Sequence, residues 1–347
     1  MNNILFMNQN NNIYTKERVR YIDISKGILI LLLIIHHLGA ATSKIGMQSR
    51  YDYIISCWQP IFTVFFMPCF FLISGYCSNF SRGYKDFICK IIRQLIIPYV
   101  VFTIILNLSI CVEKNNFGVD TFVKPITTVP NTSLWFILSL IFSKIILYIM
   151  ICCKFKNVAI ICISIFLLFL GVLLNQFDIT PNYFTYHNCL ISVFFVVMGW
   201  YLKNNISRYQ KFLKYCQYLY PVLFILSLGL FKYILHIHIP RYAAGIDVDI
   251  LSIPIFILLS ISGSLFLINI SKKIDKNAIL EYFGKNSLII YALHFITLKL
   301  LAKSLLCSDS LALFIGSLII IYIIEIVICV LLIEIFNKTA LKCLIGK

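Results

Sequence analysis

The sequence predicts an all-α integral membrane protein, a bundle of about ten transmembrane helices with both termini in the cytoplasm. Of the 347 residues, 60% are hydrophobic and only 13% are charged, whereas soluble domains average about 25% charged residues. Apolar runs of roughly 20 residues, the length that crosses a hydrocarbon core, recur along the chain. Because the backbone must satisfy its own hydrogen bonds in lipid, these runs are expected to be helices.

The order of polar and apolar segments defines one membrane domain. Residues 1–19 are polar and rich in asparagine, and they lack the apolar core of a signal peptide, so we interpret them as a cytoplasmic tail. The transmembrane domain covers residues 20–340, and residues 341–347 form a second cytoplasmic tail. Ten apolar runs are expected to span the membrane, with approximate limits 24–41, 54–76, 87–112, 133–152, 157–174, 186–202, 218–239, 250–270, 286–305 and 310–336.

The basic residues support this arrangement. Counted on alternate sides of ten spans, 21 Lys and Arg residues lie on the side of the N-terminus and 7 on the other side. This bias follows the positive-inside rule. The net charge of +16 is distributed between the apolar runs and forms no patch beside aromatic residues, which argues against nucleic-acid binding. The thirteen cysteines are scattered without metal-ligand spacing, so no metal is expected.

The first apolar run carries two adjacent histidines, His36 and His37. With about 100° of rotation per residue, Asp23, Gly27 and His37 share one stripe of the helix, and His36 lies on the opposite side. Intramembrane ionisable groups usually face a cavity and mark a functional site. A histidine can take and return a proton near neutral pH, which suits the activation of a hydroxyl. The alternative is that both are interfacial histidines at a helix end.

Several segments, in order, resemble the acyltransferase 3 family of membrane-bound O-acyltransferases. The stretch RYIDISKG at 20–27, followed by His37 fourteen positions after Asp23, resembles the family's first helix. Later segments resemble the family's FFxISG, RxxR-like, LWFL, LGxxL and GxxSLxIYLxH segments, at residues 67–76, 90–93, 134–136, 198–201 and 283–294. The chain is similar to the stand-alone members, which include fucose O-acetylases of exported saccharides. It departs from the pattern at Lys90, and it lacks a polar residue before the double Phe at 70–71.

The resemblance implies a bacterial inner-membrane enzyme that transfers an acyl group, most simply acetyl, from acyl-CoA to a hydroxyl of an exported saccharide or glycolipid. We therefore expect a catalytic set of His37, Asp23 and His294. Donor binding is assigned to the basic residues Arg20, Lys26 and Arg93, because guanidinium groups match phosphate geometry. Structural roles fall to Gly27, Ser74, Gly75 and Tyr291.

Plainer interpretations of these residues stay open. Arg93 could be a snorkelling arginine at a helix end, and Asp23 part of a solvated charge cluster. His294 shares a helical face with Ser287 and Tyr291, either as a core histidine bonded to a carbonyl or as a polar stripe opposite the first helix. The sequence does not assign roles to the remaining histidines, His187, His236 and His238. The rival function is a transporter or flippase without acyl-transfer chemistry, in which the same residues line a substrate path.

Overall fold

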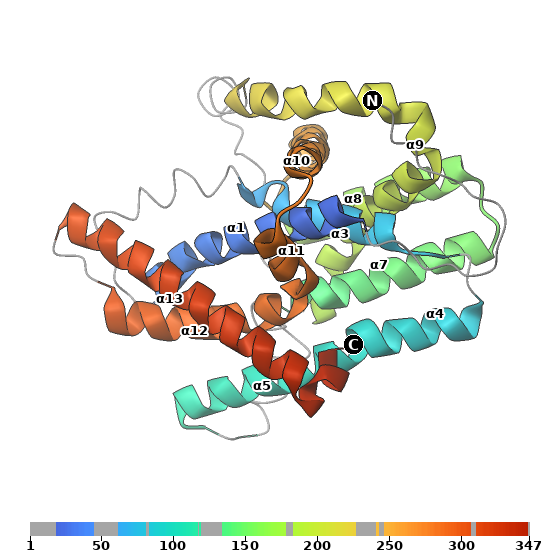
Figure 1. The fold of residues 1–347 in the computed structure, drawn as a ribbon. Coiled ribbons are helices and arrows are strands. Elements are labelled where there is room, and N and C mark those ends of the chain that lie inside the picture. The colour runs from blue at the N-terminus through green and yellow to red at the C-terminus, as the bar shows by residue number, and fades with distance from the viewer. Residues whose placement is uncertain are drawn as a thin grey trace.

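The computed structural model describes residues 19–44, 62–80, 83–116, 118, 134–177, 183–226, 241–242, 246–306 and 310–345. Helices form nearly all the regular secondary structure of this part of the chain (Figure 1). The longer helices are α1 (Arg20–Lys44), α5 (Ile97–Lys114), α7 (Trp135–Cys152), α8 (Asn157–Gln176), α9 (Tyr186–Leu226), α10 (Ile253–Ile274), α12 (Ser287–Leu305) and α13 (Leu311–Lys338). The shorter ones are α3 (Phe66–Cys77), α4 (Tyr84–Ile91), η1 (Ile92–Ile96), η2 (Tyr183–Thr185), α11 (Ala278–Lys285) and η4 (Ala340–Ile345).

The two strands make one small hairpin. Strand β1 (Arg241–Tyr242) pairs antiparallel with β2 (Ile246–Asp247), with Arg241 opposite Asp247. The Tyr242 side chain is buried, and its hydroxyl donates to the Asn188 carbonyl at 2.7 Å. The hairpin is therefore anchored to the first turn of α9.

Seven helical segments in the described part of the chain are long and apolar enough to cross a membrane. They are 20–39, 84–113, 135–152, 157–176, 253–274, 287–305 and 311–338, and each coincides with a run predicted from the sequence. Of the other three predicted runs, 54–76 is described only from residue 62, and 186–202 and the start of 218–239 both fall within α9. The protein is thus an all-α, multi-pass membrane protein, and ten spans with cytoplasmic termini remain a prediction.

Helix α9 is longer than the sequence predicts. It continues from Tyr186 to Leu226 through a polar stretch that we expected to separate two spans, with non-helical backbone angles only at Asn205. The physical reason is that residues 203–220 contain neither glycine nor proline, so nothing forces the helix to stop. Pro221 is the first such residue after the kink.

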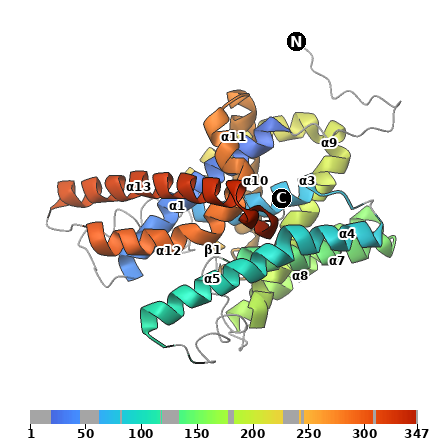
Figure 2. The ribbon, with the colours of Figure 1, turned by 60° about the horizontal axis from the view of Figure 1, so that its bottom comes forward.

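Helix α1 lies in the middle of the molecule, in contact with α3, α10, α11, α12 and α13 (Figures 1 and 2). Its closest neighbour is α11, and two glycines allow the approach. Gly27 faces the backbone carbonyl of Leu280, and Gly284 faces the backbone carbonyl of Asp23. A Cβ at either position would collide with main chain, so the small residues set the distance between the two helices.

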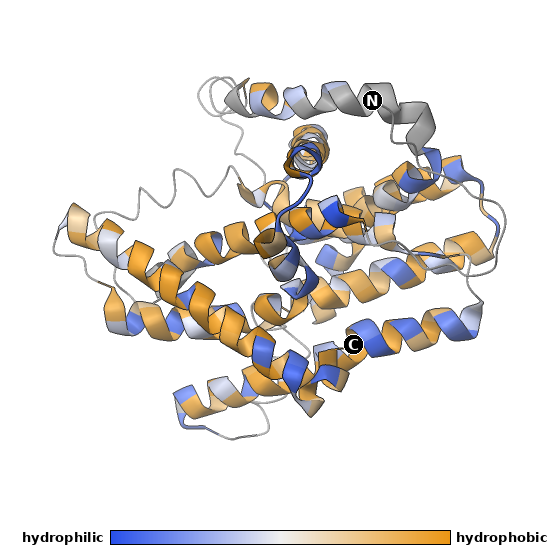
Figure 3. Cartoon of the chain, in the orientation of Figure 1, coloured by the Kyte–Doolittle hydropathy of each residue, from blue (hydrophilic) through white to orange (hydrophobic). Residues whose placement is uncertain are grey.

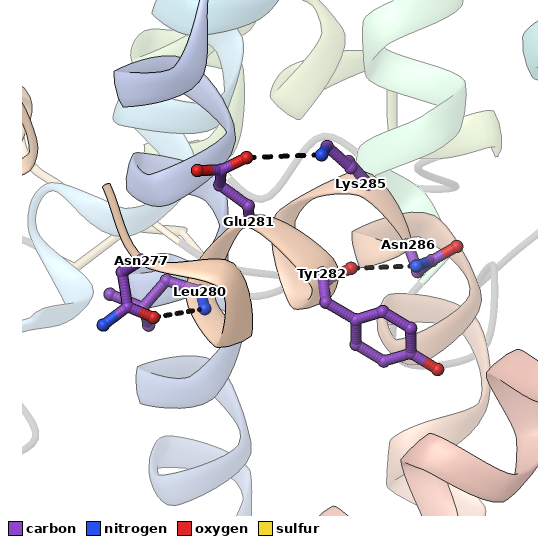
Figure 4. A network of polar contacts seen from close by, with 6 residues as sticks. All are labelled: Asn277, Leu280, Glu281, Tyr282, Lys285 and Asn286. Atoms are coloured by element: carbon purple, nitrogen blue, oxygen red, sulfur yellow. Dashed lines mark hydrogen bonds and ion pairs between the residues drawn. The ribbon is translucent and has the colours of Figure 1, made fainter. Parts of the chain in front are cut away.

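Helix α11 is a short, well-capped connection between α10 and α12 (Figure 4). The Asn277 side chain accepts a hydrogen bond from the Leu280 amide at 3.0 Å, which caps the N-terminus. At the other end the Asn286 side chain donates to the Tyr282 carbonyl at 2.8 Å. These caps hold α11 as a rigid element against α1.

The outermost helices present apolar side chains outward. Helix α13 exposes a row of aliphatic residues: Ile319, Ile320, Ile323, Val327 and Leu331. Figure 3 shows the same pattern, with hydrophobic residues over most of α13 and hydrophilic ones along α4, on the turns at either end of α11 and at other helix ends. Such a surface suits contact with lipid.

Candidate active site

Helices α1 and α12 bring together two histidines that lie 257 positions apart in the chain. The ring centroids of His37 and His294 are 4.8 Å apart, with an angle of 51° between the ring planes. Phe295 closes one side of the pair, since its ring lies 5.4 Å from that of His37 at 90°. The structure thus places the predicted His37 beside the predicted His294.

His294 is fully buried, and its tautomer follows from its surroundings. Its Nδ1 lies 2.8 Å from the Ile290 carbonyl oxygen. Because a carbonyl only accepts, Nδ1 carries the proton, and Nε2 presents a lone pair. Among the described residues Nε2 has no hydrogen-bond partner. A buried polar atom of this kind is a natural contact for a substrate.

His36 belongs to the same region but contacts a different helix. Its ring is 5.1 Å from that of His37 and packs edge-on against Phe66 of α3, at 6.5 Å. The hairpin residue Arg241 is close enough to act electrostatically on His36. The helical geometry of α1 therefore directs His37 toward α12 and His36 toward α3.

Aromatic side chains cover the inner side of the histidine pair. Tyr291 is buried, with its ring 6.4 Å from His294 and 5.2 Å from Phe136. Phe136 in turn contacts Phe71 of α3 at 4.6 Å. Trp135 packs on Tyr242 of the hairpin at 5.4 Å. This arrangement gives the LWF segment and Tyr291 a packing role beside the histidine pair.

Asp23 does not join the histidines. The continuous helix α1 separates it from His37 by fourteen residues, which is about 21 Å. Asp23 is 3% exposed and lies where α1 crosses α11, beside Gly284. The structure thus separates Asp23 from the histidine pair and shows it buried at a helix crossing, which differs from a solvated charge cluster.

The basic residues assigned to the donor lie at different places. Arg20 is exposed at the start of α1, and Lys26 is half-buried one and a half turns later. Arg93 is exposed on the π-helical turn η1, between α4 and α5. Such turns are rare and occur frequently at functional sites.

Ser74 and Gly75 occupy a tight helix crossing. Gly75 faces the Val196 carbonyl of α9, and Gly199 of α9 faces the Leu72 carbonyl of α3. The Ser74 carbonyl accepts a hydrogen bond from the Ser78 hydroxyl at 2.7 Å. The close approach of α3 and α9 therefore accounts for a glycine at position 75. Gly199, in the MGWY segment, is the corresponding glycine on α9.

Sequence reasoning missed a buried carboxyl next to this region. Glu325 of α13 is fully buried, and its Oε1 accepts from the Thr297 hydroxyl at 2.7 Å and from the Cys329 thiol at 3.3 Å. Thr297 lies one turn after His294 on α12. Within the described residues Oε2 has no partner. The signal was present in the sequence, because Glu325 interrupts an apolar run that otherwise extends from Leu318 to Ile333.

The remaining histidines and possible metal ligands are placed as follows. His187 is buried at the start of α9, against Tyr186 at 4.1 Å. His236 and His238 lie outside the described residues. Across the part of the chain that the structure describes, no three His, Cys, Asp or Glu side chains are grouped as metal ligands.

The fold and this site define a multi-pass helical membrane protein in which a buried histidine, His294, contacts a half-buried one, His37. The model of the acyltransferase 3 family, described as an acyltransferase domain, matches residues 19–334. The chain therefore belongs to this family, and it is a membrane acyltransferase that transfers groups other than aminoacyl groups. No curated protein matches the chain, and no solved structure does.

Proposed function

We propose that this enzyme transfers an acetyl group from cytoplasmic acetyl-CoA to a hydroxyl of an exported or lipid-linked saccharide. The observation that carries the proposal is the contact between the half-buried His37 and the buried His294 in a chain of the acyltransferase family. Acyl transfer to a hydroxyl needs a group that removes the hydroxyl proton, and imidazole does this near neutral pH. The pair supplies such a group beside the aromatic side chains of Phe295 and Tyr291.

In the direct mechanism His37 acts as general base. A ring nitrogen of His37 takes the proton of the acceptor hydroxyl, whose oxygen attacks the thioester carbonyl. The new C–O ester bond forms, the C–S bond breaks, and the proton passes to the departing CoA thiolate. The ring of His294, whose Nδ1 donates to the Ile290 carbonyl, packs against His37 and limits its orientation, and its Nε2 is left to accept a hydrogen bond from the substrate.

In the relay mechanism His37 is the nucleophile. Its unprotonated nitrogen attacks the thioester carbonyl, the N–C bond forms as the C–S bond breaks, and the proton of the other ring nitrogen passes to the departing thiolate. The acceptor oxygen then attacks the acyl-imidazole, the C–O bond replaces the N–C bond, and the hydroxyl proton returns to the imidazole. The position of His37 suits either route. It lies sixteen residues along α1 from Tyr21, toward the end of the helix that is opposite the basic residues assigned to the donor. Both routes remain within the proposal.

The donor is assigned to the cytoplasmic side because acyl-CoA is a cytoplasmic metabolite and the basic residues favour that side. Arg20 and Lys26 begin α1, and Arg93 follows α4 on η1. Their charges complement the phosphates of CoA. Resemblance to the stand-alone, fucose-acetylating members supports a saccharide acceptor and a bacterial inner membrane.

The test is incorporation of labelled acetyl from acetyl-CoA into the saccharide and glycolipid fraction of membranes containing the protein. His37→Ala should lower incorporation by about 10²- to 10⁴-fold, the usual contribution of a general base. His36→Ala is the matched control, because the neighbouring histidine packs on α3 instead of α12. Full incorporation by the His37→Ala protein would reject the assignment.

The same assay separates the rival function. A transporter or flippase should bind its substrate without consuming acetyl-CoA. Release of CoA thiol that depends on the wild-type protein therefore supports the enzyme and argues against transport alone.

A further inference from the structure

Helix α13 carries a carboxyl on the face that packs against the rest of the molecule. Glu325 is 0% exposed and lies in the middle of the helix. The same buried face contains Ser317, Ile321, Cys329 and Ile333. A carboxyl at this depth of a membrane-spanning helix is costly and usually has a function. Neither the direct nor the relay mechanism uses Glu325.

One oxygen of Glu325 connects α13 with α12. Its Oε1 accepts a hydrogen bond from the Thr297 hydroxyl at 2.7 Å, and a weaker one from the Cys329 thiol at 3.3 Å. Thr297 is half-buried and lies three residues after His294 on α12. A single hydroxyl thus joins the carboxyl to the turn of α12 that carries His294.

The Thr297 hydroxyl stands between two acceptors. It lies 2.7 Å from Glu325 Oε1 and 3.0 Å from the His294 carbonyl oxygen. A hydroxyl has a single proton to donate, so the shorter contact with the carboxyl competes with the longer contact with the backbone. Threonine hydroxyls that bond to the backbone of the preceding turn often bend their helix. Glu325 therefore limits a bond that would bend α12 at His294.

A bend at this turn would move one histidine ring against the other. The Nδ1 atom of His294 is bonded to the Ile290 carbonyl of the same helix, so the ring follows the backbone of α12. The His37 ring, 4.8 Å away between centroids, belongs to α1. Because a displacement of about 1 Å in a catalytic group can cost about 10²-fold in rate, a small change in α12 is enough to slow the reaction.

We propose that Glu325 is a positioning residue for acyl transfer, whose carboxyl draws the Thr297 proton away from the His294 carbonyl and so keeps the backbone of α12 in place at the histidine pair. The inference rests on the proposed function, because it takes His294 as part of the reacting site. The role needs an acceptor oxygen at position 325 and no charge. The competing role is proton transfer or substrate contact through Oε2, which has no partner among the described residues.

The experiment measures incorporation of labelled acetyl against acetyl-CoA concentration, in membranes that contain equal amounts of each variant. Glu325→Leu should lower kcat about tenfold and leave KM unchanged, the equivalent of one lost hydrogen bond in the transition state. Glu325→Gln keeps a side-chain carbonyl oxygen for Thr297 and should keep most of the rate. The double variant Thr297→Val/Glu325→Leu should recover most of the loss, since no hydroxyl is left to bond to the backbone.

Cys329→Ala is the matched control, because it removes the other donor to the same oxygen and leaves the Thr297 bond in place. It should change kcat by less than about twofold, since a thiol is a weak donor. Two results would overturn the proposal. If Glu325→Gln is as slow as Glu325→Leu, the carboxyl acts through its proton or charge. If the double variant is no faster than Glu325→Leu, the loss comes from packing. Should Glu325→Leu fail to fold, the rate of Glu325→Gln decides between the same alternatives.

A second measurement follows the position of His294 without activity. Solid-state NMR of protein with isotope-labelled histidine nitrogens gives the His294 signals, identified by their loss in His294→Ala. These signals should shift in Glu325→Leu and return in Thr297→Val/Glu325→Leu, whereas unshifted signals would contradict the proposal. If the signals behave in this way but the wild type transfers no acetyl group, the positioning role of Glu325 stands and the proposed function fails.

Discussion

The crossing of α1 and α11 gives the sharpest prediction for stability. Gly27→Ala places a Cβ against the backbone carbonyl of Leu280, which cannot rotate away as a side chain can. Overpacking of this kind costs about 1–3 kcal/mol, and a main-chain obstacle puts Gly27 in the upper half of that range. Alanine recovers about 1 kcal/mol through its higher helix propensity. The net loss of unfolding free energy should be about 1–2 kcal/mol.

The measurement is thermal unfolding of the purified protein in one detergent. A loss of 1 kcal/mol lowers Tm by about 2–4 °C for chains of 150–250 residues, so Gly27→Ala should unfold several degrees earlier. Gly316→Ala on α13 is the control, because a Cβ there meets no atom within 4 Å, and it should leave Tm unchanged or slightly higher. If Gly27→Ala unfolds at or above the temperature of Gly316→Ala, the close-crossing explanation of Gly27 is wrong.

Three further predictions concern side chains around the site. Asn277→Ala removes the cap of α11 and should cost about 1 kcal/mol in thermal unfolding, whereas Asn277→Asp, which keeps an acceptor, should not. Burial and the neighbouring Glu334 carboxylate raise the pKa of Tyr282 to about 12 from 10. As the pH rises, the unfolded chain therefore releases this proton before the folded protein does, so Tm should fall between pH 10 and 12. Tyr282→Phe should make that fall shallower. Parallel curves of Tm against pH for the wild type and Tyr282→Phe would refute the role given to Tyr282. Glu325→Leu removes a buried carboxyl, one oxygen of which has no partner among the described residues. The variant should keep Tm within a few degrees and lower the rate of acyl transfer about tenfold, the equivalent of one hydrogen bond. An unchanged rate of transfer would show that Glu325 has a packing role alone.

The sequence predicted the class of fold because long apolar runs leave few structural choices in lipid. The limits of α8 and α12 agree with the predicted runs to within about two residues, since Asn157 and Gln176 bound α8 and Asn286 and Ser287 precede the apolar part of α12. The length of helix α9 was harder to predict, because the polar stretch after residue 202 has the composition of a loop but contains no residue that breaks a helix. Helix α11 was also missed, since its eight residues lie in a polar connection between two predicted spans and are too few to cross the membrane.

The site was partly predictable for a related reason. Helical periodicity separated His37 from His36, because position along one helix fixes which neighbour a side chain faces. From the sequence, His294 could be placed only on a polar stripe of its helix that faces the polar stripe of the first helix. The direct contact between His37 and His294 could not be predicted, since the pairing of α1 with α12 depends on the packing of the whole bundle. Glu325 stands out in the sequence as a carboxyl inside an apolar run, but its contact with Thr297 of α12 depends on tertiary packing in the same way. The structure also separates Asp23 from the histidines by most of the length of α1.

The central claim is that His37 and His294 act as one unit in acyl transfer. The most direct measurement is the rate of acetyl transfer by His37→Ala, His294→Ala and the double variant, each compared with His36→Ala as the folded control. If the two histidines form one catalytic unit, each single variant loses about 10²-fold or more, and the double variant is no slower than the slower single variant. Full activity in either single variant, or losses that multiply in the double variant, would contradict the claim.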